Sequence, residues 1–175
     1  YDYGFLDQAH ARLETIVGRL GRQLRAGVPV IGLEPSCVAV FRDELPNLLG
    51  RDDTAGRLAD QSYTLEEFLV REAEYDPVPQ FGRVLLHGHC HQRAVLDFGA
   101  TRELLERAGL EVEAPDIGCC GMAGAFGFES RHYDLSVACA ELALLPLVRE
   151  ADAETVLVSD GFSCREQIRQ LAGRE

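Results

Sequence analysis

Apolar residues follow two different spacings along the chain and predict both helices and short strands. They recur at helical spacing over residues 6–24, with charged residues between them, which predicts an amphipathic helix. Short apolar runs at 28–33, 84–87, 110–114 and 155–159 predict strands. Because strands alternate with helical segments, we expect an α/β fold built from parallel βαβ units.

Polar and proline-containing segments mark the breaks between these elements. Residues 47–60 are polar, and we expect an irregular loop there. Thr64 and Glu67 have the spacing of a capping box, which predicts that a helix begins at this point. Residues 75–79 contain two prolines and predict a connector. The two small Rossmann-like halves that we expect are residues 1–76 and 77–175.

A cysteine follows each of the four predicted strands within a few residues. The cysteines are Cys37, Cys90, the adjacent Cys119 and Cys120, and Cys164. In open parallel sheets, ligands bind beyond the carboxyl ends of the strands. We therefore expect the cysteine loops to lie at this edge and all five thiols to converge on one redox site. The sixth cysteine, Cys139, lies in the helical pattern of residues 133–145 and is expected to be a buried structural thiol.

The sharpest local signal is Cys119-Cys120-Gly121. Two adjacent thiolates cannot easily bind one ion with tetrahedral angles, but they can ligate different irons of a cluster. Gly121 and the glycines near it leave the backbone free to approach a bulky inorganic core and to direct N–H groups at its sulfides. These features favour an iron–sulfur cluster with Gly121 among the cofactor-binding residues.

Three histidines, His87, His89 and His91, alternate around Cys90. His89 and His91 are placed beyond the strand end. A histidine there has three possible functional roles: its imidazole can donate a hydrogen bond to cluster sulfur, replace a thiolate ligand or relay a proton. We include these two among the cofactor-binding candidates. The alternative is that loop carbonyls satisfy the rings, and for any one histidine taken singly this alternative is the more common case.

The order of Cys90, then Cys119-Cys120-Gly121, then Cys164 resembles the cysteine-rich CCG domain. That domain occurs in heterodisulfide reductase subunits, in iron–sulfur subunits of glycolate and lactate oxidation systems, and in the C-terminal part of large FAD-linked dehydrogenases. The segments most similar to the last group are residues 32–37, 87–92, 119–124 and 159–165. The resemblance implies that the four cysteines suffice for one [4Fe–4S] cluster, with FAD bound in a preceding part of the protein.

Two positions depart from the pattern that the resemblance implies, in which two tandem repeats each end in Cys-x-x-Cys. Gly161 occupies the first position of the last such motif, and Glu34 occupies the corresponding position before Cys37. The Cys-Cys pair of the first repeat is absent and the sequence does not begin with methionine, so we expect it to begin partway through that repeat. Residues 1–76 are then the C-terminal portion of the first repeat and residues 77–175 the second.

Cys37 has two possible places under this interpretation. It either shares the pocket of the second repeat or completes a site whose other members lie upstream. We expect the shared pocket.

The charge and the apolar runs limit the partners. The formal net charge is −12, with 29 acidic and 17 basic residues. Nucleic acid is therefore not expected as a partner, because its phosphates bind to basic surfaces. No run approaches the roughly 20 apolar residues that span a bilayer, so we expect no transmembrane segment. Six cysteines without a secretory signal indicate a reducing compartment. We expect a cytoplasmic protein, with peripheral contact at the inner face of the membrane as the extent of any membrane association.

The resemblance implies an iron–sulfur electron-transfer domain of an FAD-dependent oxidoreductase that acts on a small 2-hydroxy acid of the D-lactate, glycolate or 2-hydroxyglutarate class. Its partners are then an upstream FAD-binding domain or subunit and an electron acceptor, and the chain alone is expected to be catalytically incomplete. Two alternatives stay open. One is a structural zinc module that uses three or four thiolates. The other is a thiol–disulfide module that uses Cys119 and Cys120.

Overall fold

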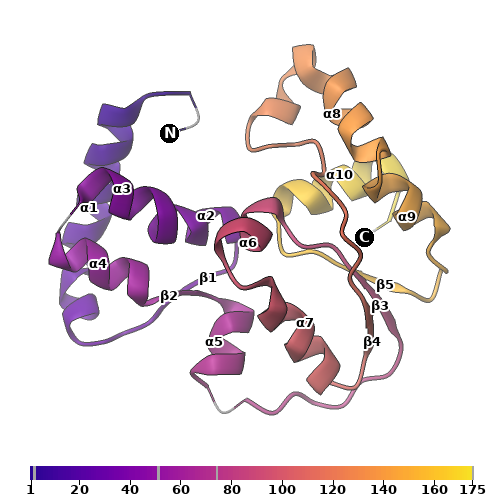
Figure 1. The fold of residues 1–175 in the computed structure, drawn as a ribbon, viewed down its shortest axis with the longest axis horizontal. Helices are drawn as coiled ribbons and strands as arrows, with labels where there is room; N and C mark the ends of the chain where they lie inside the picture. The colour runs from indigo at the N-terminus through magenta and orange to yellow at the C-terminus, as the bar shows by residue number, and fades with distance from the viewer. Residues whose placement is uncertain (2, 51, 74, 175) are drawn as a thin grey trace.

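Two small parallel sheets organise the chain, as the sequence predicts. The structure is a computed structural model that describes residues 1, 3–50, 52–73 and 75–174. The two sheets lie in different parts of the molecule, on either side of α6 and α7 (Figure 1). One sheet pairs β1 (Val30–Gly32) with β2 (Ser62–Thr64), and the other has the order β4 (Glu111–Glu113), β3 (Arg83–Leu86), β5 (Val156–Val158). All three strand pairs are parallel, so the α/β prediction is confirmed.

The first sheet belongs to a helical half. The predicted amphipathic helix is α1 (Leu6–Arg25), which packs against α3 (Leu45–Leu49) and α4 (Asp53–Asp60). Their apolar faces enclose a core formed by Leu13, Val17, Leu24, Leu45, Ala55 and Leu58. None of the helices in the described ranges has the length and apolar character needed to cross a membrane.

A continuous helical segment follows β1 and changes its winding once. It begins with α2 (Pro35–Ala39), widens into the π-helical η1 (Val40–Glu44) and continues as α3. Pro35 is tolerated because it occupies the first turn, where the missing N–H has no intrahelical partner. The segment places Cys37 in α2, directly after the carboxyl end of β1.

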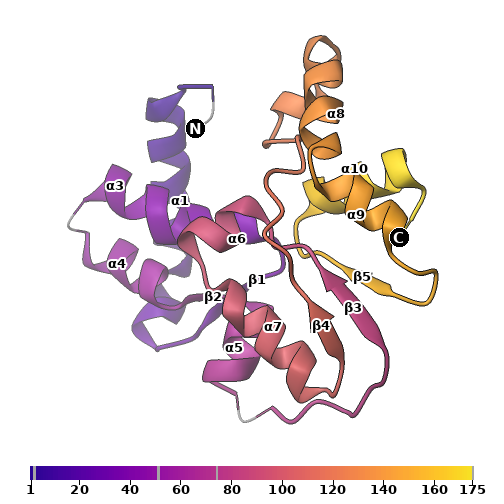
Figure 2. The same cartoon turned by 45° about the vertical axis from the view of Figure 1, so that its right-hand side comes forward.

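The second sheet is covered on both faces. α7 (Phe98–Arg107) contacts β4, whereas α9 (Leu144–Glu150) and α10 (Phe162–Ala172) pack together near β5 (Figure 2). The remaining elements of this half are α6 (Cys90–Val95), the 3-10 turns η2 (Phe126–Phe128) and η3 (Ser130–His132), and α8 (Tyr133–Glu141). The core members are Leu85, Ile117, Cys120, Met122, Leu144, Val148, Cys164 and Ile168. Two of the candidate cysteines are therefore part of the apolar core.

A buried carboxylate connects the two halves. α5 (Leu65–Arg71) begins with the predicted capping box between Thr64 and Glu67. Glu67 is fully buried and accepts from Arg42 Nη1 at 2.7 Å, from the Thr64 N–H at 3.0 Å and from the Asp97 N–H at 2.9 Å. Because these donors come from η1, from the end of β2 and from the start of α7, one side chain fixes the relative positions of three elements.

Three expectations about secondary structure are wrong. Residues 47–60 are not an irregular loop, because Asp52 caps α4 and the buried Ala55 and Leu58 hold that helix on the first core. The short strand β2 is not among the predicted strands, since its three residues show no apolar alternation. The helical pattern of residues 133–145 is divided between α8 and α9.

Glu67→Ala is expected to lower the free energy of unfolding by about 3–5 kcal/mol, because it leaves the Arg42 guanidinium and two backbone N–H groups without their buried acceptor. Urea unfolding measures the change. Glu103→Ala is the control, since Glu103 forms a solvent-exposed ion pair with Arg107 and its loss should cost no more than about 0.5 kcal/mol. Equal effects of the two substitutions would contradict the role assigned to Glu67.

Candidate functional site

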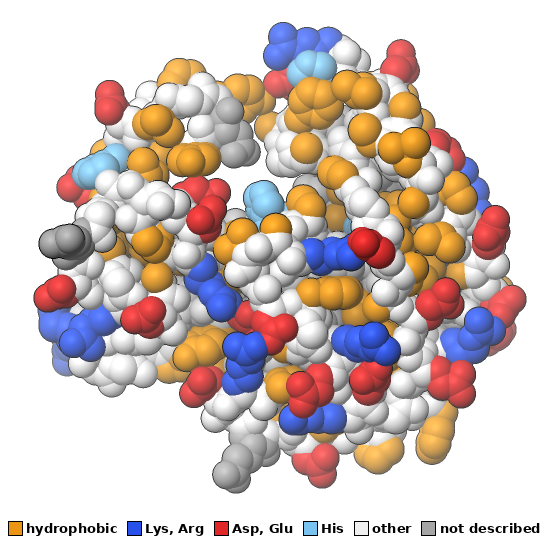
Figure 3. Space-filling model, in the orientation of Figure 1, with side chains coloured by type: hydrophobic (Ala, Val, Ile, Leu, Met, Phe, Trp, Pro, Cys, Tyr) orange, Lys and Arg blue, Asp and Glu red, His pale blue; other side chains and the backbone are white. Residues whose placement is uncertain are grey.

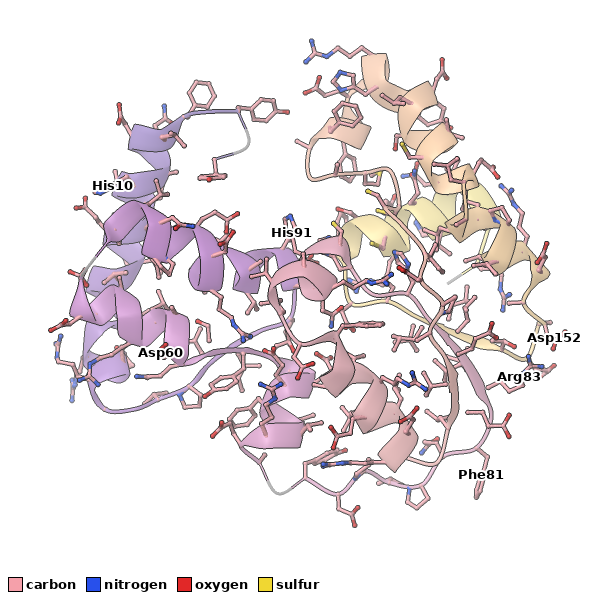
Figure 4. The ribbon with its side chains drawn as sticks, viewed as in Figure 1. His10, Asp60, Phe81, Arg83, His91 and Asp152 are labelled. Carbon is pink, nitrogen blue, oxygen red and sulfur yellow. The ribbon has the colours of Figure 1, made fainter. Side chains whose placement is uncertain are left out.

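Four of the predicted cysteines meet at the carboxyl ends of the second sheet. Cys90 is the first residue of α6 after the central strand β3, and Cys164 lies in the first turn of α10 after β5. Cys119 and Cys120 lie in the loop after β4. Their side chains form one hydrogen-bonded series that runs from Cys90 to Cys119, Cys120 and Cys164. Figure 4 shows sulfur atoms gathered near the start of α10.

The series gives neighbouring sulfurs different proton affinities. The pKa of Cys119 is lowered to about 2, because the Cys120 and Cys90 thiols donate to it and backbone N–H groups, including that of Gly121 at 3.3 Å, assist. The pKa of Cys164 is lowered to about 5, first by the hydrogen bond from Cys120 and then by the neighbouring His87 ring. The pKa values of Cys90 and Cys120 are raised, because each donates to Cys119. Two sulfurs are thus held as thiolates next to two thiols.

Gly121 is needed for the shape of the Cys-Cys loop. Its φ of +90° is disfavoured for other residues, and a Cβ atom would lie 2.0 Å from the backbone oxygen of Ser136 in α8. Ser136 is itself fixed by Gln167, whose Nε2 donates to the Ser136 oxygens at 3.1 and 3.3 Å. The glycine therefore lets the loop pack onto α8, while its N–H donates to Cys119 Sγ.

A cavity of about 500 Å³ opens beside these sulfurs. Its wall includes Cys90, Cys120, His89 and His91 from the second half and Cys37 from the first. α2 and α6 are in contact, which brings Cys37 to the same opening as Cys90. Burial, followed by the nearby Glu34 carboxylate, raises the pKa of Cys37. The space-filling view shows a hollow at the top of the molecule, between its two upper parts (Figure 3).

The residues that stand where the resemblance expects cysteines are both helix N-caps. Glu34 caps α2, with its Oε1 accepting from Ser36 Oγ at 2.9 Å, and Gly161 caps α10. Glu34 Oε2 also accepts from the Phe162 N–H at 2.8 Å, in the first turn of α10. Glu34 therefore supplies to α10 the side-chain acceptor that a glycine cap lacks.

The three histidines occupy different environments. His87 is buried beside Cys164, and its Nδ1 has no hydrogen-bond partner among the described residues. His89 is also buried, whereas His91 is exposed and points into the opening (Figure 4). In the described part of the chain, no ring nitrogen of these three histidines bonds to a loop carbonyl. Sequence reasoning ranks His87 below the other two because it ends a strand, yet its ring bonds the sulfur of Cys164.

Cys139 lies apart from the other cysteines. It is in α8, as the helical pattern predicts. Its side chain is only partly buried, whereas a buried thiol is expected. The reason is that the fully buried face of α8 is formed by Ser136 and Ala140, which leaves Cys139 at the edge. Among the described residues, no group of three or more His, Cys, Asp or Glu side chains is arranged to hold a metal ion.

Fold and site together define a thiol-rich centre at the edge of a parallel α/β sheet, and the sequence of the chain is similar to those of dehydrogenases. The chain is 31% identical over 173 residues to one subunit of the anaerobic glycerol-3-phosphate dehydrogenase of Escherichia coli K12, covering 94% of this chain and 42% of that subunit. It is 28% identical over 175 residues to D-2-hydroxyglutarate dehydrogenase of E. coli K12, covering 97% of this chain and 17% of that protein. The Pantoea ananatis enzyme of the same name is 29% identical over 174 residues, covering 97% of this chain and 16% of that enzyme.

The chain thus spans less than half of each of these relatives and corresponds to a part of an oxidoreductase rather than to a whole one. No family model matches the chain, and no solved structure matches it.

Gly121→Ala is expected to lower the free energy of unfolding by about 1–3 kcal/mol, because the new methyl group meets the Ser136 carbonyl and the φ is strained. Gly118→Ala is a matched control in the same loop, since a Cβ there meets nothing within 4 Å. Thermal unfolding of both variants tests the expectation. A Gly121 variant as stable as the Gly118 variant would show that the loop does not need the close approach to α8.

Proposed function

We propose that the chain is the iron–sulfur electron-transfer part of an FAD-dependent oxidoreductase that acts on a small 2-hydroxy acid. The observation that carries the proposal is the contact series of Cys90, Cys119, Cys120 and Cys164 at one sheet edge. The names of the relatives support the reaction class, because both D-2-hydroxyglutarate and glycerol-3-phosphate are oxidised at a hydroxyl-bearing carbon.

The donor set fits a cluster by its chemistry. Soft thiolate ligands select iron–sulfur clusters, zinc and copper(I), and four cysteines are the usual ligand set of a [4Fe–4S] centre. Cys119 and Cys164 already favour the ionised form that ligation requires. The His87 ring, which bonds Cys164, has a second buried nitrogen, Nδ1, without a partner among the described residues.

When bound, the cluster supplies one-electron transfer between the flavin and an acceptor. The chain's own residues determine its surroundings. Cys120 and Cys164 belong to the apolar core and would hold the cluster on the side from which water is excluded. The N–H of Gly121 donates to Cys119 and partly neutralises that thiolate. His91 and Gly121 are proposed as cofactor-binding residues together with His89.

We also propose that the chain divides into two repeats, with residues 1–76 as the C-terminal portion of one repeat and residues 77–175 as a second one. The support is local similarity, because a parallel strand followed by a capped helix with Ser-Cys in its first turn occurs twice, at Cys37 and at Cys164. FAD and the electron acceptor are then bound by other parts of the protein or by partner subunits.

Anaerobic purification followed by iron and acid-labile sulfide analysis tests the cluster. We expect about four irons and four sulfides per chain, and a loss of most of both in Cys119→Ser and Cys120→Ser, because each substitution removes one ligand. Cys139→Ser is the matched control and should keep the full content, since Cys139 lies outside the series. Equal iron in all variants would contradict the assigned ligands.

Two other results would replace the proposal. Zinc without sulfide would indicate a structural module. Absence of metal together with a reversible two-electron thiol titration would indicate thiol–disulfide chemistry, which the contact between Cys90 and the low-pKa Cys119 would serve.

Cys37→Ser separates the two places considered for this residue. If Cys37 belongs to the shared pocket, the variant should keep its iron, because four thiolates remain, but its electron paramagnetic resonance spectrum should change, because Cys37 lines the same cavity as Cys90. A spectrum identical to that of the unaltered protein would mean that Cys37 serves a site outside this chain.

A further inference from the structure

The His89 ring is held in one tautomer by the start of α6. His89 is the N-cap of that helix, and its Nδ1 accepts a hydrogen bond from the His91 N–H at 3.2 Å. An imidazole nitrogen that accepts a backbone N–H carries no proton of its own. The neutral ring therefore has its proton on Nε2 and is a donor at that atom.

This tautomer argues against His89 as an iron ligand. A histidine that binds metal through one nitrogen almost always donates the N–H of the other nitrogen to a carboxylate, a carbonyl or water. In His89 the second nitrogen accepts instead. The ring is a better hydrogen-bond donor than a ligand.

The ring that carries this donor lines the cavity beside the sulfurs. His89 is only 6% exposed, it lines the cavity with Cys90 and Cys120, and its Nε2 has no acceptor among the described residues. The ring packs on Gly161, the N-cap of the helix that carries Cys164 in its first turn, so it lies beside the start of α10. An N–H at the wall of this cavity is available to a group bound inside it.

We propose that His89 is a cofactor-contacting residue whose Nε2–H would donate to a sulfur of the bound cluster near Cys164, either the thiolate or an adjacent sulfide. The inference rests on the proposed cluster and adds the group that sets its potential. A hydrogen bond to sulfur stabilises the reduced state, which carries one more negative charge, and so raises the reduction potential.

Gly161 keeps the ring in place. A Cβ at this position would lie 2.3 Å from His89 Cδ2 and 3.0 Å from Cγ. The backbone does not require glycine, since φ is −71° and ψ is 122°, which any residue adopts. The glycine is therefore explained by the ring that packs on it, and the position where the resemblance expects a thiolate is filled by His89.

The test is a set of variants in the protein purified anaerobically. Redox titration of the cluster signal should give a lower potential for His89→Phe, which keeps a ring but has no donor, and a value closer to the original for His89→Gln, which keeps an N–H. His10→Phe is the control, on α1 and far from His91 in Figure 4, and should not change the potential.

Electron nuclear double resonance of the reduced protein provides a second measurement. The unaltered protein should show an exchangeable proton coupled to the cluster that disappears in His89→Phe. An unchanged potential and an unchanged proton signal in His89→Phe would overturn the inference, as would a strong nitrogen coupling typical of a ligand. A protein without iron would instead overturn the proposed cluster.

The packing is tested separately by a double-mutant cycle. Gly161→Ala should lower the melting temperature in the protein that retains His89 and should have a much smaller effect in the His89→Ala background, where the methyl group has room. Equal effects in both backgrounds would show that Gly161 does not support the ring.

Discussion

Parallel pairing on both sides of β3 is the constraint on which the site depends. The pairs Val84 with Val112 and Val84 with Val156 align the three strands in one direction, so the connections after all three leave from one edge. The candidate cysteines are separated by many residues in the sequence, and only this common direction brings them together. The strands have three or four residues each, so buried side chains on both faces, rather than long ladders, keep the alignment.

Around that edge, the size of several side chains is set by the group that each one contacts. Gly161 is small because the His89 ring packs on it, and Glu34 is long because it reaches the α10 N-terminus that Gly161 cannot cap. Gly121 is small because the Ser136 carbonyl lies where its Cβ would be. The departures from the Cys-x-x-Cys pattern are therefore not gaps in the site. Each is occupied by a group with a defined contact, one of which links the two halves.

Patterns local in sequence predict most of the fold and the meeting of four cysteines. The β-strand runs, α1 and the capping box at Thr64 are visible because their signals lie within a few residues. What cannot be predicted depends on distant partners. The burial of Glu67 needs Arg42 and Asp97, and the contact of His87 with Cys164 needs the β3–β5 pairing. Sequence reasoning misses α4 because its apolar face is only two residues wide, and those residues are stable as a helix only against α1.

The cysteines differ sharply in exposure, with Cys37, Cys90 and Cys119 exposed and Cys120 and Cys164 buried. The site therefore has a solvent-exposed side and a buried side. Anything that reaches the sulfurs from solution, whether an oxidant, an assembly factor or a redox partner, has to approach from the exposed side. Oxidation and reassembly of the centre would then occur from the same side, and a protein bound over that side would shield the centre and accept its electrons at the same time.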